Sequence, residues 1–68
     1  MELGRNIKYF RNKLKISQTM LAQKVGVTQG TVSMWENDVI EPTASYVVKL
    51  CNVLEVSADT LLDIENQY

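Results

Sequence analysis

One stretch decides the fold of this chain: Ser17-Gln18-Thr19-Met20-Leu21-Ala22-Gln23-Lys24-Val25-Gly26-Val27-Thr28-Gln29-Gly30-Thr31-Val32-Ser33-Met34-Trp35-Glu36-Asn37. Its spacing predicts two short helices joined by a turn. The first helix places Leu21, Ala22 and Val25 toward a core, and the second does the same with Val32 and Trp35. A glycine between them, Gly26, suits the left-handed conformation that ends a helix.

Polar side chains gather at the start of the second helix, which we place at residues 28–37. Gln29 is the most informative, because a carboxamide can both donate a hydrogen bond to adenine and accept one from it in the major groove. Gly30 has no side chain to read a base, and its expected use is close approach of the backbone to DNA. Two helices in this order predict a unit whose second helix enters the major groove.

The rest of the chain also shows helical spacing. A helix from about Glu2 to Leu14 is predicted by apolar residues at intervals of four, three and four: Leu3, Ile7, Phe10 and Leu14. A fourth helix has a core stripe of Val47, Leu50, Cys51 and Leu54, and a short fifth helix turns Ala58, Leu61 and Leu62 inward. Helix caps are expected at four hydroxyl residues: Ser17, Thr28, Thr43 and Ser57.

These elements predict an all-α fold, a compact five-helix bundle in a single domain over residues 1–68. The core is expected over about residues 3–63, with 64–68 as a tail. No segment shows the alternation of apolar and polar residues that is typical of a strand, and the sequence contains no repeat.

Composition narrows the classes of function. The 68 residues include one cysteine, Cys51, and no histidine, so neither an internal disulfide nor a zinc cluster is expected. Cys51 lies on an apolar stripe and is expected to be an inert buried thiol. No apolar run approaches the ~20 residues that span a membrane. We therefore expect no enzyme, no cofactor, no small-molecule ligand and no membrane contact, and a location in the cytoplasm.

Net charge is −1, which argues mildly against a nucleic-acid partner. The charges are unevenly distributed, however. Residues 1–24 hold six cations against Glu2 alone, and residues 25–68 hold Lys49 against seven carboxylates. Such asymmetry gives one end of a small domain a positive field, although ordinary surface charge explains it nearly as well.

Each candidate site residue has a structural alternative. We assign base contacts to Gln29, Thr31 and Met34, although a lone glutamine on a helix is usually only solvated. Backbone phosphate or bracing contacts are assigned to five residues: Gln18, Ser17, Thr28, Ser33 and Asn37. Ser17 and Thr28 are equally well explained as caps. Arg11 and Glu36 are expected to form a structural ion pair, and Trp35 is expected in the core.

The combined pattern resembles the Cro and phage-repressor type of helix-turn-helix domain. The resemblance covers roughly residues 5–63 and rests on Ser17-Gln18, Leu21-Ala22, Gly26-Val27-Thr28, Val32-Ser33, Trp35-Glu36-Asn37 and Pro42. It implies a lambda-repressor-like bundle that binds a two-fold related operator in double-stranded DNA as a homodimer. It also implies DNA-facing positions at Gln18, Gln29, Thr31, Ser33, Met34 and Asn37, and pairing of Arg11 with Glu36.

Three departures from that family pattern matter. Lys15 and Asp38 stand where the family usually has glycine. In the loop that follows, Val39-Ile40-Glu41 replaces the cations that family members often direct to phosphate, which predicts weaker binding and a shallower salt dependence. Val39 and Ile40 are expected to pack either on the core or against a second subunit.

The leading hypothesis is a sequence-specific transcriptional regulator, a repressor that acts by occupying its operator. The alternative is a protein-interaction module, such as an antitoxin or another partner-binding regulator. It would use its acidic C-terminal half to bind a basic partner, and the missing loop cations motivate it.

Overall fold

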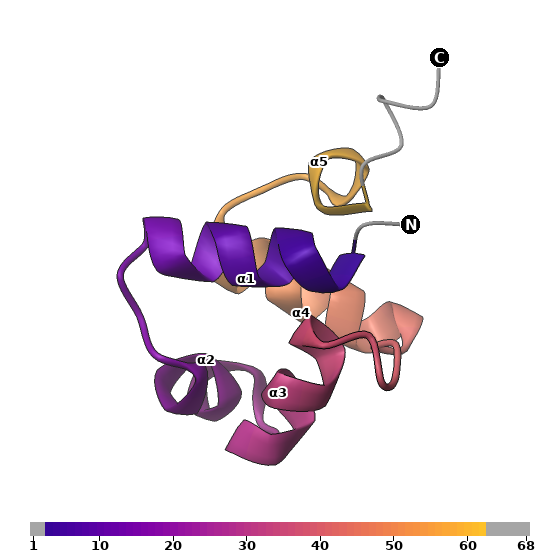
Figure 1. The fold of residues 1–68 in the computed structure, drawn as a ribbon. Helices are drawn as coiled ribbons and strands as arrows, with labels where there is room; N and C mark the ends of the chain where they lie inside the picture. The colour runs from indigo at the N-terminus through magenta and orange to yellow at the C-terminus, as the bar shows by residue number, and fades with distance from the viewer. Residues whose placement is uncertain (1–2, 63–68) are drawn as a thin grey trace.

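Five helices account for most of the chain in the computed structural model, which describes residues 3–62 (Figure 1). They are α1 (Leu3–Lys13), α2 (Gln18–Val25), α3 (Gln29–Glu36), α4 (Ala44–Leu54) and α5 (Ala58–Leu62). No strand occurs within residues 3–62. The all-α, five-helix prediction is confirmed, while the expected tail at 64–68 lies outside the described residues.

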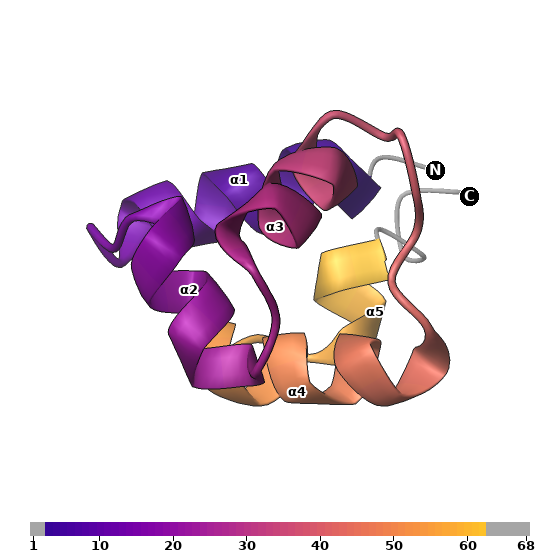
Figure 2. The ribbon, with the colours of Figure 1, turned by 90° about the horizontal axis from the view of Figure 1, so that it is seen from below.

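The helices pack around one apolar core. Its buried members come from all five helices: Leu3, Ile7, Leu21, Ala22, Val25, Val32, Trp35, Leu50, Leu54 and Leu61. In Figure 1, α2 and α3 lie at the lower end of the molecule and α5 lies at the opposite end. Viewed from below, α4 runs across from α1, and α5 contacts both of them (Figure 2). In this arrangement of the five helices, one side of α3 lies outside the core.

Side-chain caps begin three of the helices as expected. The hydroxyl oxygen of Ser17 accepts from the Met20 N–H at 3.0 Å, and that of Ser57 accepts from the Thr60 N–H at 3.1 Å. Thr28 does the same for α3, as described below. The prediction for Thr43 is wrong: it occupies the cap position of α4, but its hydroxyl lies 3.2 Å from the Ser45 hydroxyl and makes no capping bond.

Two apolar residues expected in the core are exposed. Leu14 follows the last residue of α1 and is 37% exposed, because the helix ends before a neighbouring element covers that position. Ala58 is exposed at the first position of α5, where only Leu61 is fully buried and Leu62 is half-buried. Val47 and Cys51, on the stripe of α4, are likewise only half-buried.

A glycine in α1 permits close contact between α1 and α3. A Cβ atom placed on Gly4 would lie 2.5 Å from the Trp35 carbonyl oxygen and 2.9 Å from that of Glu36. Backbone atoms cannot move aside as a flexible side chain can. Gly4 therefore lets the start of α1 lie directly against the end of α3, a requirement that the sequence analysis missed.

Candidate nucleic-acid interface

The connection between α2 and α3 sets the orientation of α3. Gly26 adopts φ of 84°, and its N–H donates to the Ala22 carbonyl at 2.8 Å. The Val27 N–H donates to the same carbonyl at 2.9 Å, so the chain turns within three residues. Thr28 then starts α3, since its hydroxyl accepts from the Thr31 N–H at 3.2 Å. Short bonded turns of this kind hold two helices at a fixed angle.

The two faces of α3 have opposite environments. Val32 is 0% exposed and Trp35 is 2% exposed, and the Trp35 ring lies against Tyr46 with a centroid separation of 5.6 Å. Gly30 and Met34 are exposed on the other side, and Gln29 is exposed as the first residue of the helix. In Figure 1, α3 lies at the lower end of the molecule. Insertion into a DNA groove requires a helix with one face packed in the core and the other face exposed to solvent.

The predicted base-contacting residues all lie on α3. Gln29 is its first residue, and the side-chain nitrogen of Gln29 donates to the Gln18 side-chain oxygen at 2.7 Å. Thr31 is half-buried, with its hydroxyl 2.9 Å from that of Thr28. Met34 is 38% exposed. The side-chain amide of Gln29 is therefore held in place, whereas Thr31 has its hydroxyl engaged within the turn.

The predicted phosphate-contacting residues lie at both ends of the same unit. Ser17 and Gln18 are at the start of α2, and Thr28 is at the start of α3. At the other end of α3, the Asn37 side-chain nitrogen donates to the Ser33 carbonyl at 2.9 Å and lies 3.3 Å from the Ser33 hydroxyl. The structure thus brings all eight candidate residues to α2, α3 and their caps.

A buried ion pair ties α1 to α3. The Arg11 Nε atom donates to Glu36 Oε2 at 2.7 Å, and Arg11 Nη2 donates to Glu36 Oε1 at 3.1 Å. Arg11 also donates to the Ile16 carbonyl at 2.9 Å. The expected pairing is therefore present and two-pronged, a geometry that fixes both partners. Glu36 accepts a further hydrogen bond that the sequence did not predict, from the side-chain nitrogen of Gln18 at 2.9 Å.

The loop after α3 offers apolar surface and one carboxylate. Val39 is 66% exposed and Ile40 is 43% exposed, and Glu41 is also exposed. Of the two expected environments, packing on the core is wrong, because the side chains of Val39 and Ile40 are exposed. Packing against a second subunit remains a prediction.

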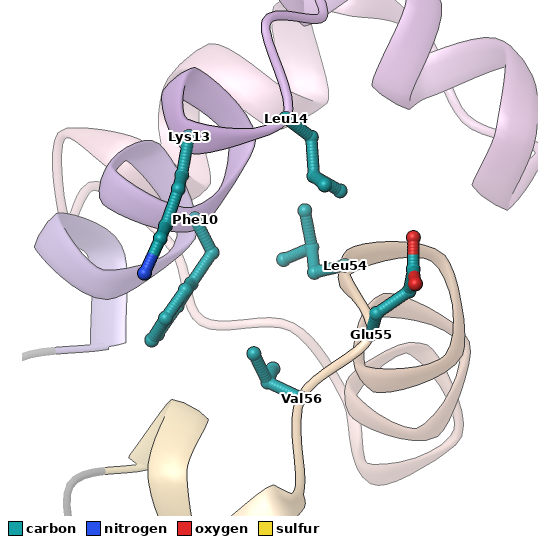
Figure 3. Close-up of a pocket in the computed structure, with 6 residues that line it drawn as sticks. All are labelled: Phe10, Lys13, Leu14, Leu54, Glu55 and Val56. Carbon is teal, nitrogen blue, oxygen red and sulfur yellow. The ribbon is translucent and has the colours of Figure 1, made fainter.

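A separate hollow of about 340 Å³ lies between the ends of α1 and α4 (Figure 3). Phe10, Leu14, Leu54 and Val56 form its apolar wall, with Lys13 and Glu55 at its margins. This hollow is where the exposed side of Leu14 is directed. Because no residue of α2 or α3 lines it, it is not part of the surface described above.

Cys51 is a free cysteine in α4, and its side chain is half-buried. Burial raises the pKa of the Cys51 thiol, since it removes water from the charged thiolate. A smaller thiolate fraction makes the group less nucleophilic. This agrees with the expectation of an inert thiol, although Cys51 is less buried than predicted.

Helix order, turn and buried pair together define a helix-turn-helix protein, and the chain belongs to the helix-turn-helix family, whose sequence model matches residues 7–61. Within residues 3–62, no helix is long and apolar enough to cross a bilayer.

Similar proteins include the repressor protein C2 of Salmonella phage P22, which is 38% identical over 60 residues, or 88% of this chain. The crystal structure of that repressor with a synthetic operator superposes with a TM-score of 0.85 and 36% identity, covering 90% of this chain and 92% of that one.

The transcriptional regulator SinR of Bacillus subtilis is 33% identical over 66 residues, or 96% of this chain. Its crystal structure in complex with DNA superposes with a TM-score of 0.83 and 35% identity, covering 90% of this chain and 98% of that one. The chain spans 28% of the length of the C2 repressor and 60% of that of SinR.

Proposed function

We propose that this chain is a sequence-specific DNA-binding transcriptional regulator that inserts α3 into the major groove of an operator. One observation carries the proposal: Gln29 stands at the exposed start of α3 with its amide held by Gln18. A side chain that is ordered before binding loses less conformational entropy when it contacts a base.

The relatives support this proposal. The C2 repressor of phage P22 was solved with a synthetic operator and SinR was solved with DNA, and both superpose closely on this chain. These relatives favour DNA binding over the protein-interaction module. Repression by occupancy of the operator is proposed from the same relatives, whose full lengths exceed this chain.

Within this function the residues divide by what they contact. Gln29, Thr31 and Met34 face base edges and select sequence, whereas Gln18, Ser17, Thr28, Ser33 and Asn37 contact or brace the phosphate backbone and set the register. The starts of α2 and α3 also present backbone N–H groups that favour phosphate. We propose that these residues act by binding alone, without a catalytic residue or a cofactor, and that the protein acts in the cytoplasm.

We propose a homodimer on a two-fold related site. The exposed apolar side chains of Val39 and Ile40, adjacent to the end of α3, support a contact with a second copy. Two recognition helices then enter successive major grooves about 34 Å apart. With Glu41 in this loop in place of a cation, few phosphate contacts contribute, so binding has a shallow salt dependence.

Selection of bound duplexes from a random pool tests the proposal. A two-fold symmetric consensus is the expected result, with affinity for that consensus well above affinity for random duplex. Failure to enrich any sequence, together with no binding at low salt, would overturn the regulator function and leave the protein-interaction module.

A further inference from the structure

A continuous chain of hydrogen bonds links the buried ion pair to Gln29. Arg11 donates twice to Glu36, the Gln18 side-chain nitrogen donates to Glu36 Oε1 at 2.9 Å, and the Gln29 side-chain nitrogen donates to Gln18 Oε1 at 2.7 Å. Gln29 and Glu36 are seven residues apart in α3, so they lie two turns apart on about the same face. Gln18 lies along that face and contacts both.

The chemistry of the buried end gives this chain of bonds a direction. A guanidinium only donates hydrogen bonds, and a carboxylate only accepts them. Gln18 must therefore turn its nitrogen toward Glu36, which leaves its oxygen toward Gln29. Gln29 must then turn its own nitrogen toward Gln18. An amide on its own has no such preference, since its two ends are nearly equal in shape.

The anchor of the chain is well fixed. The side chains of Arg11 and Glu36 are 10% and 2% exposed, and a third donation from Arg11 goes to the Ile16 carbonyl. None of the buried side-chain polar atoms within residues 3–62 lacks a hydrogen-bond partner. Reversing the order of donors would leave Glu36 facing an amide oxygen, which is repulsive at this separation.

We infer that Glu36 is a positioning residue for base recognition: through Gln18 it fixes which end of the Gln29 amide faces the groove. The inference rests on the proposed function and names the base. Gln29 retains its oxygen as an acceptor and one N–H as a donor, and no hydrogen bond within residues 3–62 uses that oxygen. Adenine presents the matching pair, an N6 donor and an N7 acceptor.

The opposite orientation of Gln29 would select a different base. With its oxygen turned toward Gln18, both N–H groups of Gln29 would face the groove. Guanine presents two acceptors there, O6 and N7, and would match them. The carboxylate of Glu36 thus discriminates adenine from guanine without contacting DNA.

The test measures a ratio of affinities rather than an affinity. The duplex is the consensus selected from a random pool, and the position read by Gln29 is the one at which Gln29→Ala loses its preference. The wild-type protein should bind the A·T duplex about 5- to 150-fold more tightly than a duplex with G·C at that position. Fluorescence anisotropy on the two duplexes gives the ratio for each variant.

Two variants interrupt the chain at different points. Glu36→Gln keeps the shape but can present either end to Gln18, so both orientations become available. Gln18→Met keeps the Arg11–Glu36 pair and removes the link, which provides a test even where Glu36→Gln does not fold. Each should bring the A·T to G·C ratio down toward 1, a reduction of at least about fivefold. Gln23→Met, an exposed glutamine on α2 outside the chain of bonds, should leave the ratio unchanged.

The possible results distinguish a failure of this inference from a failure of the proposed DNA-binding function. The inference would be overturned if folded Gln18→Met kept the wild-type ratio, even with weaker binding to both duplexes. The chain of bonds would then be only structural. A wild-type preference for guanine at the Gln29 position would also overturn the inference. A wild-type protein that enriches no sequence would instead overturn the proposed function and the inference together.

Discussion

The inner and outer faces of α3 differ in what a substitution there changes. On the inner face, Val32, Trp35 and Glu36 are buried, α3 packs against α1 and α2, and Trp35 lies against Tyr46 of α4. On the outer face, Gly30 and Met34 are exposed, and Gln29 is exposed as the first residue of the helix, so these three residues contribute little to the core. One helix of eight residues therefore carries both the stability of the fold and its proposed specificity. The two properties should be separable by mutation, and the following predictions test that separation.

The largest expected effect is on the inner face. Trp35→Ala should lower the free energy of unfolding by about 3–5 kcal/mol, because it empties the space beside Tyr46. This is a large share of the stability of a small domain. Urea denaturation followed by circular dichroism measures it, with Met34→Ala as the control expected to stay within about 0.5 kcal/mol of wild type. An unchanged midpoint for Trp35→Ala would place the indole outside the core.

A pair of glycines gives a second comparison. Gly4→Ala should destabilise by about 1–3 kcal/mol, because its new methyl group would meet the Trp35 and Glu36 carbonyls. Gly30→Ala, on the outer face, has no atom closer than 3.9 Å and should stabilise α3 by up to about 1 kcal/mol. Thermal melts of the two variants measure both signs. Equal effects would show that the ends of α1 and α3 are not in close contact.

Binding, rather than stability, should change at Gln29. Gln29→Ala should weaken binding to the selected operator by about 1–3 kcal/mol while the melting temperature stays within a degree or two of wild type. Affinity for random duplex should be nearly unaltered, since phosphate contacts remain. Titrations on both duplexes measure the difference. An equal loss on each would assign Gln29 to the backbone instead of a base.

The smallest expected effect separates two threonines at cap positions. Thr28→Ala should cost about 1 kcal/mol of stability, because it removes the bond to the Thr31 N–H. Thr43→Ala should cost only a few tenths, since Thr43 makes no capping bond. Paired urea titrations resolve the two. A larger loss for Thr43→Ala would mean that its hydroxyl reaches the backbone of α4 in solution.

The helices could be predicted from the sequence because their signals are local. Intervals of three and four residues identify a helix and its inner face, and residues such as Gly26 mark its ends. The same intervals do not report how far a neighbouring element extends. Leu14 and Ala58 have the right spacing, yet each lies at a helix end that neighbouring elements leave partly exposed. Gly4 was missed for a related reason, since its neighbours come from more than thirty residues away.

The membership of the candidate site was predictable, and so was the Arg11–Glu36 pair, but the link from Gln18 to Glu36 was not. The family pattern placed the polar residues on α2 and α3, and the structure brings them together there. The donation from Gln18 to Glu36 had no signal in the spacing, because it depends on a side-chain rotamer across two helices. The roles assigned to these residues on DNA remain predictions until binding is measured.

Three turns in this bundle place a non-glycine residue in the left-handed backbone conformation, which is strained. Lys15, Asp38 and Glu55 have φ of 60°, 58° and 61°, and each follows the end of a helix. Residues with a Cβ atom are strained there by about 1–2 kcal/mol, and glycine is not. A protein engineer seeking a heat-resistant version of this scaffold would therefore begin at those three junctions, none of which is among the residues proposed to contact DNA.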